Sequence, residues 1–394
     1  MALDGPEAGG AWEPSPAAAL RRLAAVRPQD YARTRNRLDG AVTRLSPYIP
    51  HGVLTLPQVL DAAQSAHRLT DSEGRAMEPA HKFISELAWR EYFHHVWRHE
   101  GPAIFASLHP GPLPEDAYET ALPSDIQAGQ TGVPVIDQAV SELQASGHLH
   151  NHARLWLASY VVHVRKVHWR AGADWLYGHL LDGDLASNHL SWQWVAGTGS
   201  HKPYLFNAAN VEKFAPPPWH SRGTVVDTTY EALEVLAHQT APQGSGPAPA
   251  GPSPRSRSNL APPAELLARP PFALPEATAP DLDGAWLIHP WNLRRPPDES
   301  RPVVGVFPAR FHAQWPWSPR RWRWVLELMR CHTDRIYWCD AAPPASARTV
   351  DDPHLRDWLA PGQGEPVPRI WPDPGVRCGS FSKFWVRAQR GSPA

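Results

Sequence analysis

The stretch DGDLASNHLSWQWVAG, residues 182–197, decides the fold of the region around it. Asp184 can accept hydrogen bonds from the free N–H groups of a first helical turn, so it predicts the start of a helix. Asn188 and Trp192 follow at i+4 and i+8 and share one helix face, and Gly197 ends the helix. An amide among indoles suits the binding of a flat, redox-active ring. An aromatic core helix with a capping aspartate is the alternative that this spacing leaves open.

Helical periodicity extends over most of the chain up to about residue 235, and Gly or Pro separates the segments. No strand pattern interrupts it, so this part is predicted to be all-α with one long helix at its centre. The predicted helices cover residues 79–99, 134–147, 151–170 (the long helix), 173–181 and 184–196.

The remaining segments differ in composition. The first residues are rich in Gly, Pro and Ala, and the region around 240–280 is rich in Pro, Gly and Ser, which is typical of disordered or linking chain. Short apolar runs at 285–288, 303–307 and 335–339 flank a predicted helix at 319–330, a pattern that indicates a small α/β unit. We therefore expect a mainly α protein with four parts: a disordered tail (1–16), a helical domain (17–235), a Pro/Gly/Ser-rich linker (236–283) and a small α/β domain (284–394).

Composition excludes several classes of protein. The formal net charge is -1, so any binding of nucleic acid must use a local basic patch. No apolar run approaches the roughly 20 residues that cross a bilayer. The three cysteines, Cys331, Cys339 and Cys378, match no metal-ligand spacing, and reduced thiols fit a cytoplasmic protein.

Two further runs combine polar and aromatic groups. Thr43-Arg44-Leu45-Ser46 places hydroxyls around an arginine at a loop–helix junction, where free N–H groups can hold a diphosphate; a simple helix cap before Pro47 is the alternative. Phe83, Glu86, Trp89 and Arg90 share one helix stripe, which suits a planar ring with polar edges. An ordinary Glu86–Arg90 surface pair is the alternative there.

Three alternating histidines, His148, His150 and His152, suggest a metal site at first sight. Alternate positions on a helix point in different directions, and no partnering carboxylate or thiolate set is evident, so we expect no metal. Arg154 is better placed, because it can pair with Asp182 or Asp184 and hold a carboxylate beside a cofactor.

Taken in order, these runs resemble the helical FAD-binding domain of the photolyase/cryptochrome family over roughly residues 17–235. The family's N-terminal α/β antenna domain is expected to be missing, because the pattern begins almost at residue 17. The matching pieces are Tyr31 to Arg35, Thr43 to Tyr48, Glu86 to Tyr92, Thr131 to Asp137, Gly147 to Arg154, Asp182 to Trp194, Tyr204 and Glu212 to Phe214.

The resemblance implies FAD as cofactor and assigns roles by position. Asn188 would face flavin N5, where an amide is typical of repair enzymes. Trp89 and Trp194 would clasp a flipped pyrimidine dimer, with Glu86 and Asn151 on its polar edges. Catalytic roles fall to Glu86, Asn188 and the electron-relay tryptophans Trp192 and Trp169. The implied cofactor-binding residues are Tyr31, Thr43, Arg44, Leu45, Ser46, Phe83, Glu86, Arg90, Asn151, Arg154, Asp182, Asp184 and Asn188.

The implied function is repair of pyrimidine dimers in DNA by a carbon–carbon lyase that uses blue light and electron transfer from reduced FAD. Two alternatives stay open: a cryptochrome-like photoreceptor that repairs nothing, and a degenerate FAD-binding or structural protein. Three departures from the family pattern favour these alternatives. Residues 114–127 hold Tyr118 but no third tryptophan, Leu155 replaces a common Met, and the loop after Gly199 is short.

The α/β unit lies outside the resemblance. It can bind a signalling partner or serve a packing role, and a monomer is expected. Its dense tryptophans fit either an aromatic surface or a buried core; they are Trp315, Trp317, Trp322 and Trp324.

Overall fold

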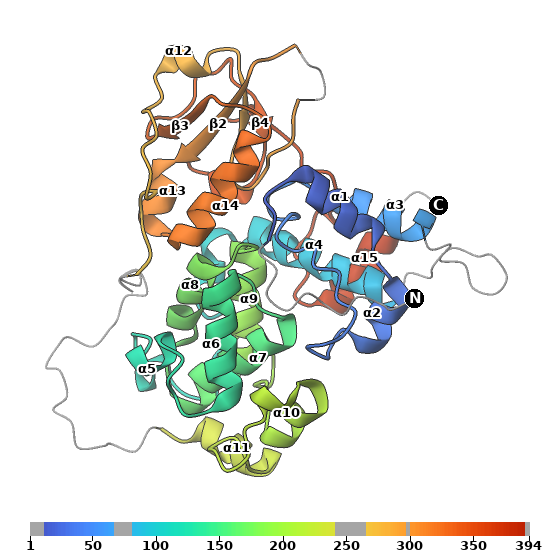
Figure 1. The fold of residues 1–394 in the computed structure, drawn as a ribbon, viewed down its shortest axis with the longest axis vertical. Helices are drawn as coiled ribbons and strands as arrows, with labels where there is room; N and C mark the ends of the chain where they lie inside the picture. The colour runs from blue at the N-terminus through green and yellow to red at the C-terminus, as the bar shows by residue number, and fades with distance from the viewer. Residues whose placement is uncertain (1–11, 67–80, 241–264, 297–299, 391–394) are drawn as a thin grey trace, which may run out of the picture.

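The structure is a computed structural model that describes residues 12–66, 81–240, 265–296 and 300–390. A helical body and a smaller α/β lobe lie side by side, with the lobe at the top of Figure 1. Most of the predicted tail, residues 1–16, lies outside the described residues, and the first helix begins at Pro16. The predicted fold class, mainly α with a small α/β unit after the helical domain, is confirmed.

The helical body is built from short and medium helices in chain order. They are α1 (Pro16–Ala24), α2 (Pro28–Thr34), α3 (Leu56–Ala66), α4 (Lys82–Glu100), α5 (Ser124–Gln127), α6 (Pro134–Ser146), α7 (Asn151–Ser159), α8 (Trp169–His179), α9 (Leu185–Ala196), α10 (Ala208–Phe214) and α11 (Tyr230–His238).

Helix α9 begins and ends where its sequence predicts. The Asp184 carboxylate accepts a hydrogen bond from the Ser187 N–H at 2.8 Å, and Gly197 closes the helix at φ +79°. Trp192 packs against α8, and a Cβ on Gly172 would lie only 2.3 Å from its ring. Glycine at position 172 therefore allows α8 and α9 to approach this closely.

The predicted long helix over 151–170 is wrong. Helix α7 ends at Ser159, a π-helical turn covers Tyr160–Val164, and Lys166 adopts φ +54° before α8 begins. The Lys166 ammonium donates to the carbonyl oxygens of Leu236 and Ala237, at 2.6 and 3.2 Å. The apolar pattern runs through the break because both helices face one core, whereas the break itself is stabilised by the distant α11.

The lobe contains a three-stranded parallel sheet in the order β1-β2-β3. The strands are β1 (Trp286–Ile288), β2 (Val303–Pro308) and β3 (Ile336–Cys339), with Leu287 paired to Val304 and Val306 to Tyr337. The crossover from β2 to β3 contains α13 (Ala309–Gln314) and α14 (Pro319–Arg330). A small second sheet pairs β4 (Thr349–Val350) with β5 (Gly364–Glu365).

The lobe tryptophans form a buried core rather than an aromatic surface. Trp317 and Trp322 have no exposed area, and Trp315 and Trp324 are each 5% exposed. Part of the predicted linker, residues 265–283, also belongs to the lobe. Leu267 exchanges backbone hydrogen bonds with Trp317, and the Ala277 N–H donates to Trp338 O; α12 (Ala279–Leu282) follows.

The end of the predicted α/β unit leaves the lobe and crosses the helical body. The buried Glu91 carboxylate on α4 accepts hydrogen bonds from the N–H groups of Ile370 and Trp371, at 2.6 and 3.3 Å. Helix α15 (Phe381–Arg390) then lies along α4, as Figure 1 shows. The chain from 367 to 390, the C-terminal segment, is therefore part of the helical body's surface.

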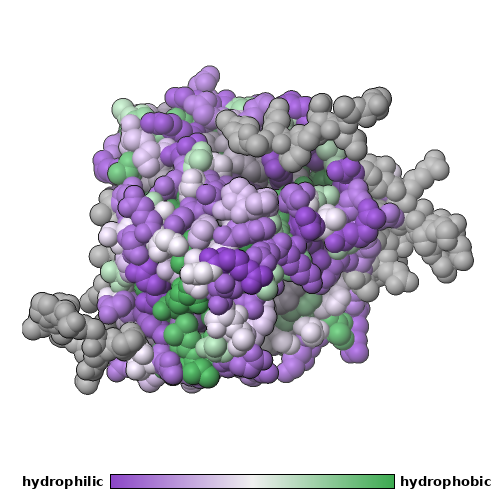
Figure 2. Space-filling view, turned by 60° about the horizontal axis from the view of Figure 1, so that its bottom comes forward, coloured by the Kyte–Doolittle hydropathy of each residue, from purple (hydrophilic) through white to green (hydrophobic). Residues whose placement is uncertain are grey.

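The end of the molecule that carries α10 and α11 is mostly hydrophilic, with one small hydrophobic group among the polar side chains (Figure 2). Val225, Tyr230 and Val235 are exposed apolar residues in the segment around α11. Among the described helices, none combines the length and apolar character needed to cross a membrane.

Arg321 on α14 joins the lobe to the helical body. Its fully buried guanidinium donates to the carbonyl oxygens of Tyr177 at 2.5 Å and Gly183 at 2.6 Å. It also lies between the rings of Tyr177 and Trp317, with centroids 4.4 and 4.1 Å away. A Cβ on Gly183 would lie 2.4 Å from this guanidinium, so position 183 must be glycine for the contact to form.

Arg321→Ala should lower the free energy of unfolding by about 3–5 kcal/mol, because it leaves two buried carbonyls unsatisfied and opens a cavity. Denaturant titration measures the change. Arg323→Ala, on an exposed position of the same helix, is the matched control and should alter stability little. Equal stability of both variants would mean that Arg321 does not anchor the lobe.

Candidate functional site

The turn between α8 and α9, residues 182–184, carries two buried carboxylates. Arg154 Nη2 donates to both carboxylate oxygens of Asp182, at 2.7 Å (Oδ2) and 3.0 Å (Oδ1). Burial alone would raise the pKa of Asp182, but the charges of Arg154 and His148 and hydrogen bonds from Arg154 and Ser46 together outweigh it and bring the pKa down to about 2. Asp182 is therefore ionised at neutral pH. Arg154 was predicted to pair with Asp182 or Asp184, and in the structure it pairs with Asp182.

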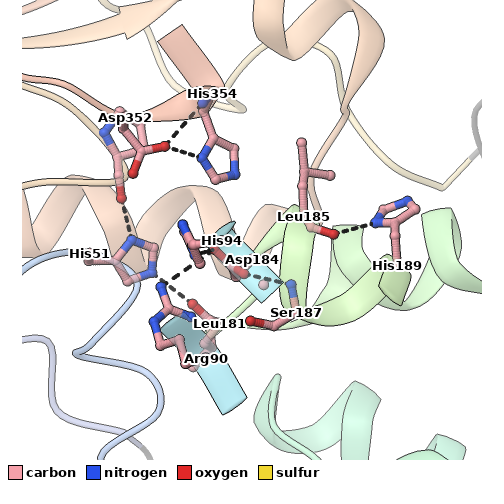
Figure 3. A network of polar contacts seen from close by, with 12 residues as sticks. His51, Arg90, His94, Leu181, Asp184, Leu185, Ser187, His189, Asp352 and His354 are labelled. Carbon is pink, nitrogen blue, oxygen red and sulfur yellow. Dashed lines mark hydrogen bonds and ion pairs between the residues drawn. The ribbon is translucent and has the colours of Figure 1, made fainter. Parts of the chain in front are cut away.

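Two side chains of α4 bind the Asp184 carboxylate (Figure 3). His94 Nε2 lies 2.8 Å and Arg90 Nη2 lies 3.4 Å from Asp184 Oδ2. Burial opposes ionisation, yet His94 and Arg90 hold the pKa of Asp184 well below its usual range. The same carboxylate thus caps α9 and fixes α4 against it. The sequence prediction missed His94, although its i+4 spacing from Arg90 on the polar stripe was a usable indication.

The 43–46 loop fits a phosphate group. Arg44 has φ +53°, which turns the backbone so that successive N–H groups can point to one side. The Leu45 N–H donates to Thr43 Oγ1 at 3.3 Å, whereas the N–H groups of Arg44 and Ser46 donate to no described residue. Hydrogen bonding from Ser46 also helps to lower the pKa of Asp182, so this loop lies against the turn at 182–184.

Tyr31, Phe83 and Glu86 form another part of the predicted cofactor wall. The Tyr31 and Phe83 rings meet edge to face at 5.5 Å, and burial, with the nearby Glu86 charge, raises the pKa of Tyr31. Glu86 pairs with Arg35 at 3.4 Å and Lys82 at 3.9 Å. Because Arg90 pairs with Asp184 instead, the alternative Glu86–Arg90 surface pair does not form.

Asn188 and the relay tryptophans are buried in the body. Asn188 Nδ2 donates to Ala173 O at 2.8 Å, which orients the amide and leaves its oxygen without a donor among the described residues. Trp192 and Trp169 are 2% and 3% exposed, and Trp169 Nε1 donates to Ser107 Oγ at 3.0 Å. The His168 ring lies 5.7 Å from the Trp169 ring, and the Tyr118 ring lies 6.3 Å from the His168 ring, measured between centroids.

The two tryptophans predicted to clasp the substrate have different surroundings. Trp89 is stacked on Phe381 of α15, with ring centroids 4.1 Å apart and planes 7° from parallel. Trp194 is 40% exposed and lies 5.5 Å from Tyr204, and Asn151 is exposed. The C-terminal segment, which the helical pattern does not include, therefore covers one face of Trp89, and the role of Trp89 in a substrate clasp stays a prediction.

The alternating histidines have separate partners. His150 Nδ1 accepts from the His152 N–H, His152 contacts Asn36 O and the Tyr204 hydroxyl, and the His148 ring lies 4.8 Å from the Trp12 ring.

A different group, His95, His99 and Asp373, is the one set in the described chain with metal-like spacing. His95 Nε2 accepts from the Cys378 N–H at 3.1 Å, so its other nitrogen carries a proton and donates to Asp373. These groups dock the C-terminal segment.

Several polar atoms near the turn have no partner in the described chain, which is a test of whether a cofactor fits. Ser187 Oγ in the first turn of α9 and His150 Nε2 at the start of α7 are fully buried and unpaired. With the free N–H groups of Arg44 and Ser46, they are suited to a ligand that has both phosphate groups and a polar ring edge. FAD is such a ligand.

Comparison with known proteins identifies the region that holds this site. Residues 83–217 match the family model described as the FAD binding domain of DNA photolyase. Residues 83–217 therefore form a domain of the photolyase/cryptochrome family. This includes the turn at 182–184, and FAD, the predicted cofactor, is the one for which the matched domain is named.

Curated relatives include both named classes of this family. A deoxyribodipyrimidine photo-lyase of Synechococcus sp. is 34% identical over 214 residues, which cover 51% of this chain and 43% of the relative. That of Streptomyces griseus is 36% identical and covers 43% of this chain and 36% of the relative. A cryptochrome DASH of Idiomarina loihiensis is 32% identical, covering 46% and 40%. The chain thus spans less than half the length of these relatives.

Solved structures of the family are also similar. A Synechocystis cryptochrome is 25% identical with a TM-score of 0.45, covering 54% of this chain and 46% of that one. A bacterial class III photolyase from Agrobacterium tumefaciens is 24% identical with a TM-score of 0.44, covering 58% and 52%.

Asp182→Asn should make the free energy of unfolding fall less steeply as the pH is lowered, which is the acid limb of the stability curve. Because folding lowers the pKa of Asp182 from 3.8 to about 2, its stabilisation is present above pH 4 and is lost as the pH falls through 2. This amounts to about 2 kcal/mol. Chemical denaturation between pH 5 and pH 2 measures the loss, which should be smaller in Asp182→Asn.

The exposed Asp116→Asn is the control, and its acid limb should match that of the unchanged protein. An equally steep limb in Asp182→Asn would mean that the Arg154–Asp182 pair does not stabilise the folded turn.

Proposed function

We propose that this chain binds FAD and repairs pyrimidine dimers in DNA under blue light. The observation that carries the proposal is the junction of three elements: the turn at 182–184, the 43–46 loop and the polar stripe of α4. Paired carboxylates, free N–H groups and an oriented amide meet there within a domain of the photolyase/cryptochrome family.

Each part of this junction has a distinct task in cofactor binding. The N–H groups of Arg44 and Ser46, together with the Arg90 guanidinium, would neutralise the diphosphate. The Arg154–Asp182 pair would hold a carboxylate at the ring edge. Asn188, oriented by Ala173 O, would present its amide to the ring. FAD, when bound, reduced and excited by light, would supply the electron that opens the cyclobutane ring.

The remaining catalytic roles concern electrons and the extruded base. Trp192 and Trp169 are buried near α9 and would relay electrons during photoreduction. Trp194 offers an exposed indole face on which a flipped base can stack. Glu86, 33% exposed and paired with Arg35, would hydrogen-bond the dimer.

The decisive experiment combines cofactor analysis with a repair assay. Purified protein should be yellow with non-covalent FAD, and blue light with a reductant should restore oligonucleotides that contain a cyclobutane dimer. Chromatography of the illuminated oligonucleotide measures repair. Protein that takes up no FAD would contradict both FAD binding and repair; protein that binds and photoreduces FAD without repair would contradict repair alone.

Trp192→Phe should slow photoreduction strongly while leaving repair intact when the cofactor is reduced chemically. Absorbance during illumination measures photoreduction. Trp219→Phe, another buried indole, is the matched control and should photoreduce at the rate of the unchanged protein. Loss of repair with chemically reduced cofactor in Trp192→Phe would contradict a pure relay role.

A second function, light signalling without repair, is favoured by one observation. The stacking of Phe381 on Trp89 closes the indole face that the repair function needs, and it joins that face to a separate C-terminal helix. A light-driven change at the cofactor would then alter the docking of α15, the element available to a signalling partner.

Phe381→Ala distinguishes these functions. If the chain repairs DNA, uncovering Trp89 should strengthen binding of dimer-containing DNA several-fold, because one aromatic contact of about 1 kcal/mol no longer competes. Fluorescence anisotropy measures the affinity, and Val386→Ala, exposed on the same helix, is the control. If the chain signals, neither variant binds the lesion, and illumination of the unchanged protein speeds tryptic cleavage within α15.

A further inference from the structure

A small cavity lies where three parts of the chain meet, and it is separate from most of the residues described above. The part of α4 from Arg90 to Arg98, the segment 49–56, the lobe and the start of the C-terminal segment line a cavity of about 70 Å³. Its apolar lining includes Ile49, Leu54 and Val367. This volume suits a small ion or a few waters, whereas pockets for larger ligands occupy about 300 Å³ or more.

Four of the six charged side chains that line the cavity have hydrogen-bond or ion-pair partners, and none of the four has a buried polar atom left unpaired in the described chain. Arg90 and His94 both face Asp184, Asp352 is paired with His354, and Glu91 accepts two backbone hydrogen bonds from the C-terminal segment. Each of these four side chains has at least one hydrogen-bond or ion-pair partner, although Nε2 of His354 is itself buried without one.

The other two lining charges, Arg98 and Arg369, are not satisfied. Arg98 forms no hydrogen bond or ion pair with any described residue, and its Nη1 is fully buried. Arg369 uses Nη1 to bind Asp373 at 2.9 Å, but its Nη2 is also buried and unpaired. Burial and the nearby charge of Arg369 lower the pKa of Arg98, and they outweigh the opposite effect of the Asp352, Asp373 and Asp351 carboxylates. Two positively charged guanidinium groups, each with an unpaired N–H donor, therefore line the same cavity.

We infer that this cavity binds a small oxyanion, with phosphate as the ligand class, between Arg98 and Arg369. A buried donor without a partner costs roughly 1–3 kcal/mol, and more when it is charged. An oxyanion would satisfy both free donors and screen the repulsion between the two arginines, and a guanidinium pairs well with the oxygens of a phosphate. The bound ion would also tie α4 to the C-terminal segment.

The inference does not depend on FAD. Of the residues predicted to bind the cofactor, Arg90 alone lines this cavity, and neither the 43–46 loop nor Asn188 does. A phosphate in the cavity should therefore bind whether or not FAD is present.

Isothermal titration with inorganic phosphate, in a buffer free of other oxyanions, tests the site on the full chain. One phosphate should bind per chain and raise the melting temperature. Arg98→Gln should weaken binding about tenfold or more. It should also raise the melting temperature in phosphate-free buffer, because it removes an unpaired charge. Arg356→Gln, exposed and outside the cavity, is the matched control and should change neither property.

A second variant and a second probe complete the test. Arg369→Gln should weaken phosphate binding as Arg98→Gln does, and glycerol phosphate distinguishes a free ion from a phosphate monoester. Absence of phosphate binding to the unchanged protein would overturn the inference. So would undiminished binding to Arg98→Gln, or displacement of phosphate by FAD, which would assign the arginines to the flavin site.

Discussion

The burial of Arg321 at the turn between α8 and α9 is the constraint on which the rest of the structure depends. A guanidinium without exposed area needs hydrogen-bond acceptors, and here Nη1 and Nη2 donate to the carbonyl oxygens of Tyr177 and Gly183, whereas Nε has no partner among the described residues. Two aromatic rings stack on its faces. The lobe is thus fixed to the one turn whose neighbouring residues, Asp182 and Asp184, form the candidate site.

This arrangement gives the lobe a structural role in the site. Its arginine supports the turn from behind while Arg154 and the α4 pair of Arg90 and His94 hold the two carboxylates from the other sides. A turn with charges fixed in this way needs little rearrangement when a ligand binds, which favours both affinity and orientation. The lobe tryptophans, in turn, belong to the hydrophobic core that shields Arg321 from solvent.

Helix α4 serves two surfaces of the molecule. One face carries Phe83, Glu86 and Arg90 toward the candidate site. The other, with Glu91 and His95, binds the C-terminal segment through backbone hydrogen bonds. Trp89 lies where the two surfaces meet, and its stacking on Phe381 joins the predicted lesion face to the end of the described chain. Repair and signalling therefore differ physically in whether this contact opens to DNA or to a protein partner.

The sequence by itself determined the helical character of the first part of the chain, the start and end of α9, and the strands and helix of the lobe. These features depend on contacts within a few residues, such as the Asp184 cap and the apolar periodicity, so their pattern is visible locally. The pairing of Arg154 with a carboxylate of the turn was also predictable, because two buried charges of opposite sign require each other.

Only the tertiary structure decided where α7 ends, that the lobe tryptophans are buried, that residues 265–283 lie along the lobe, and that the C-terminal segment covers Trp89. Each of these depends on partners distant in sequence: Lys166 on carbonyls of α11, Trp317 on Leu267, and Phe381 on α4. Local patterns state which side chains need burial or a partner, but they do not state which distant segment provides it.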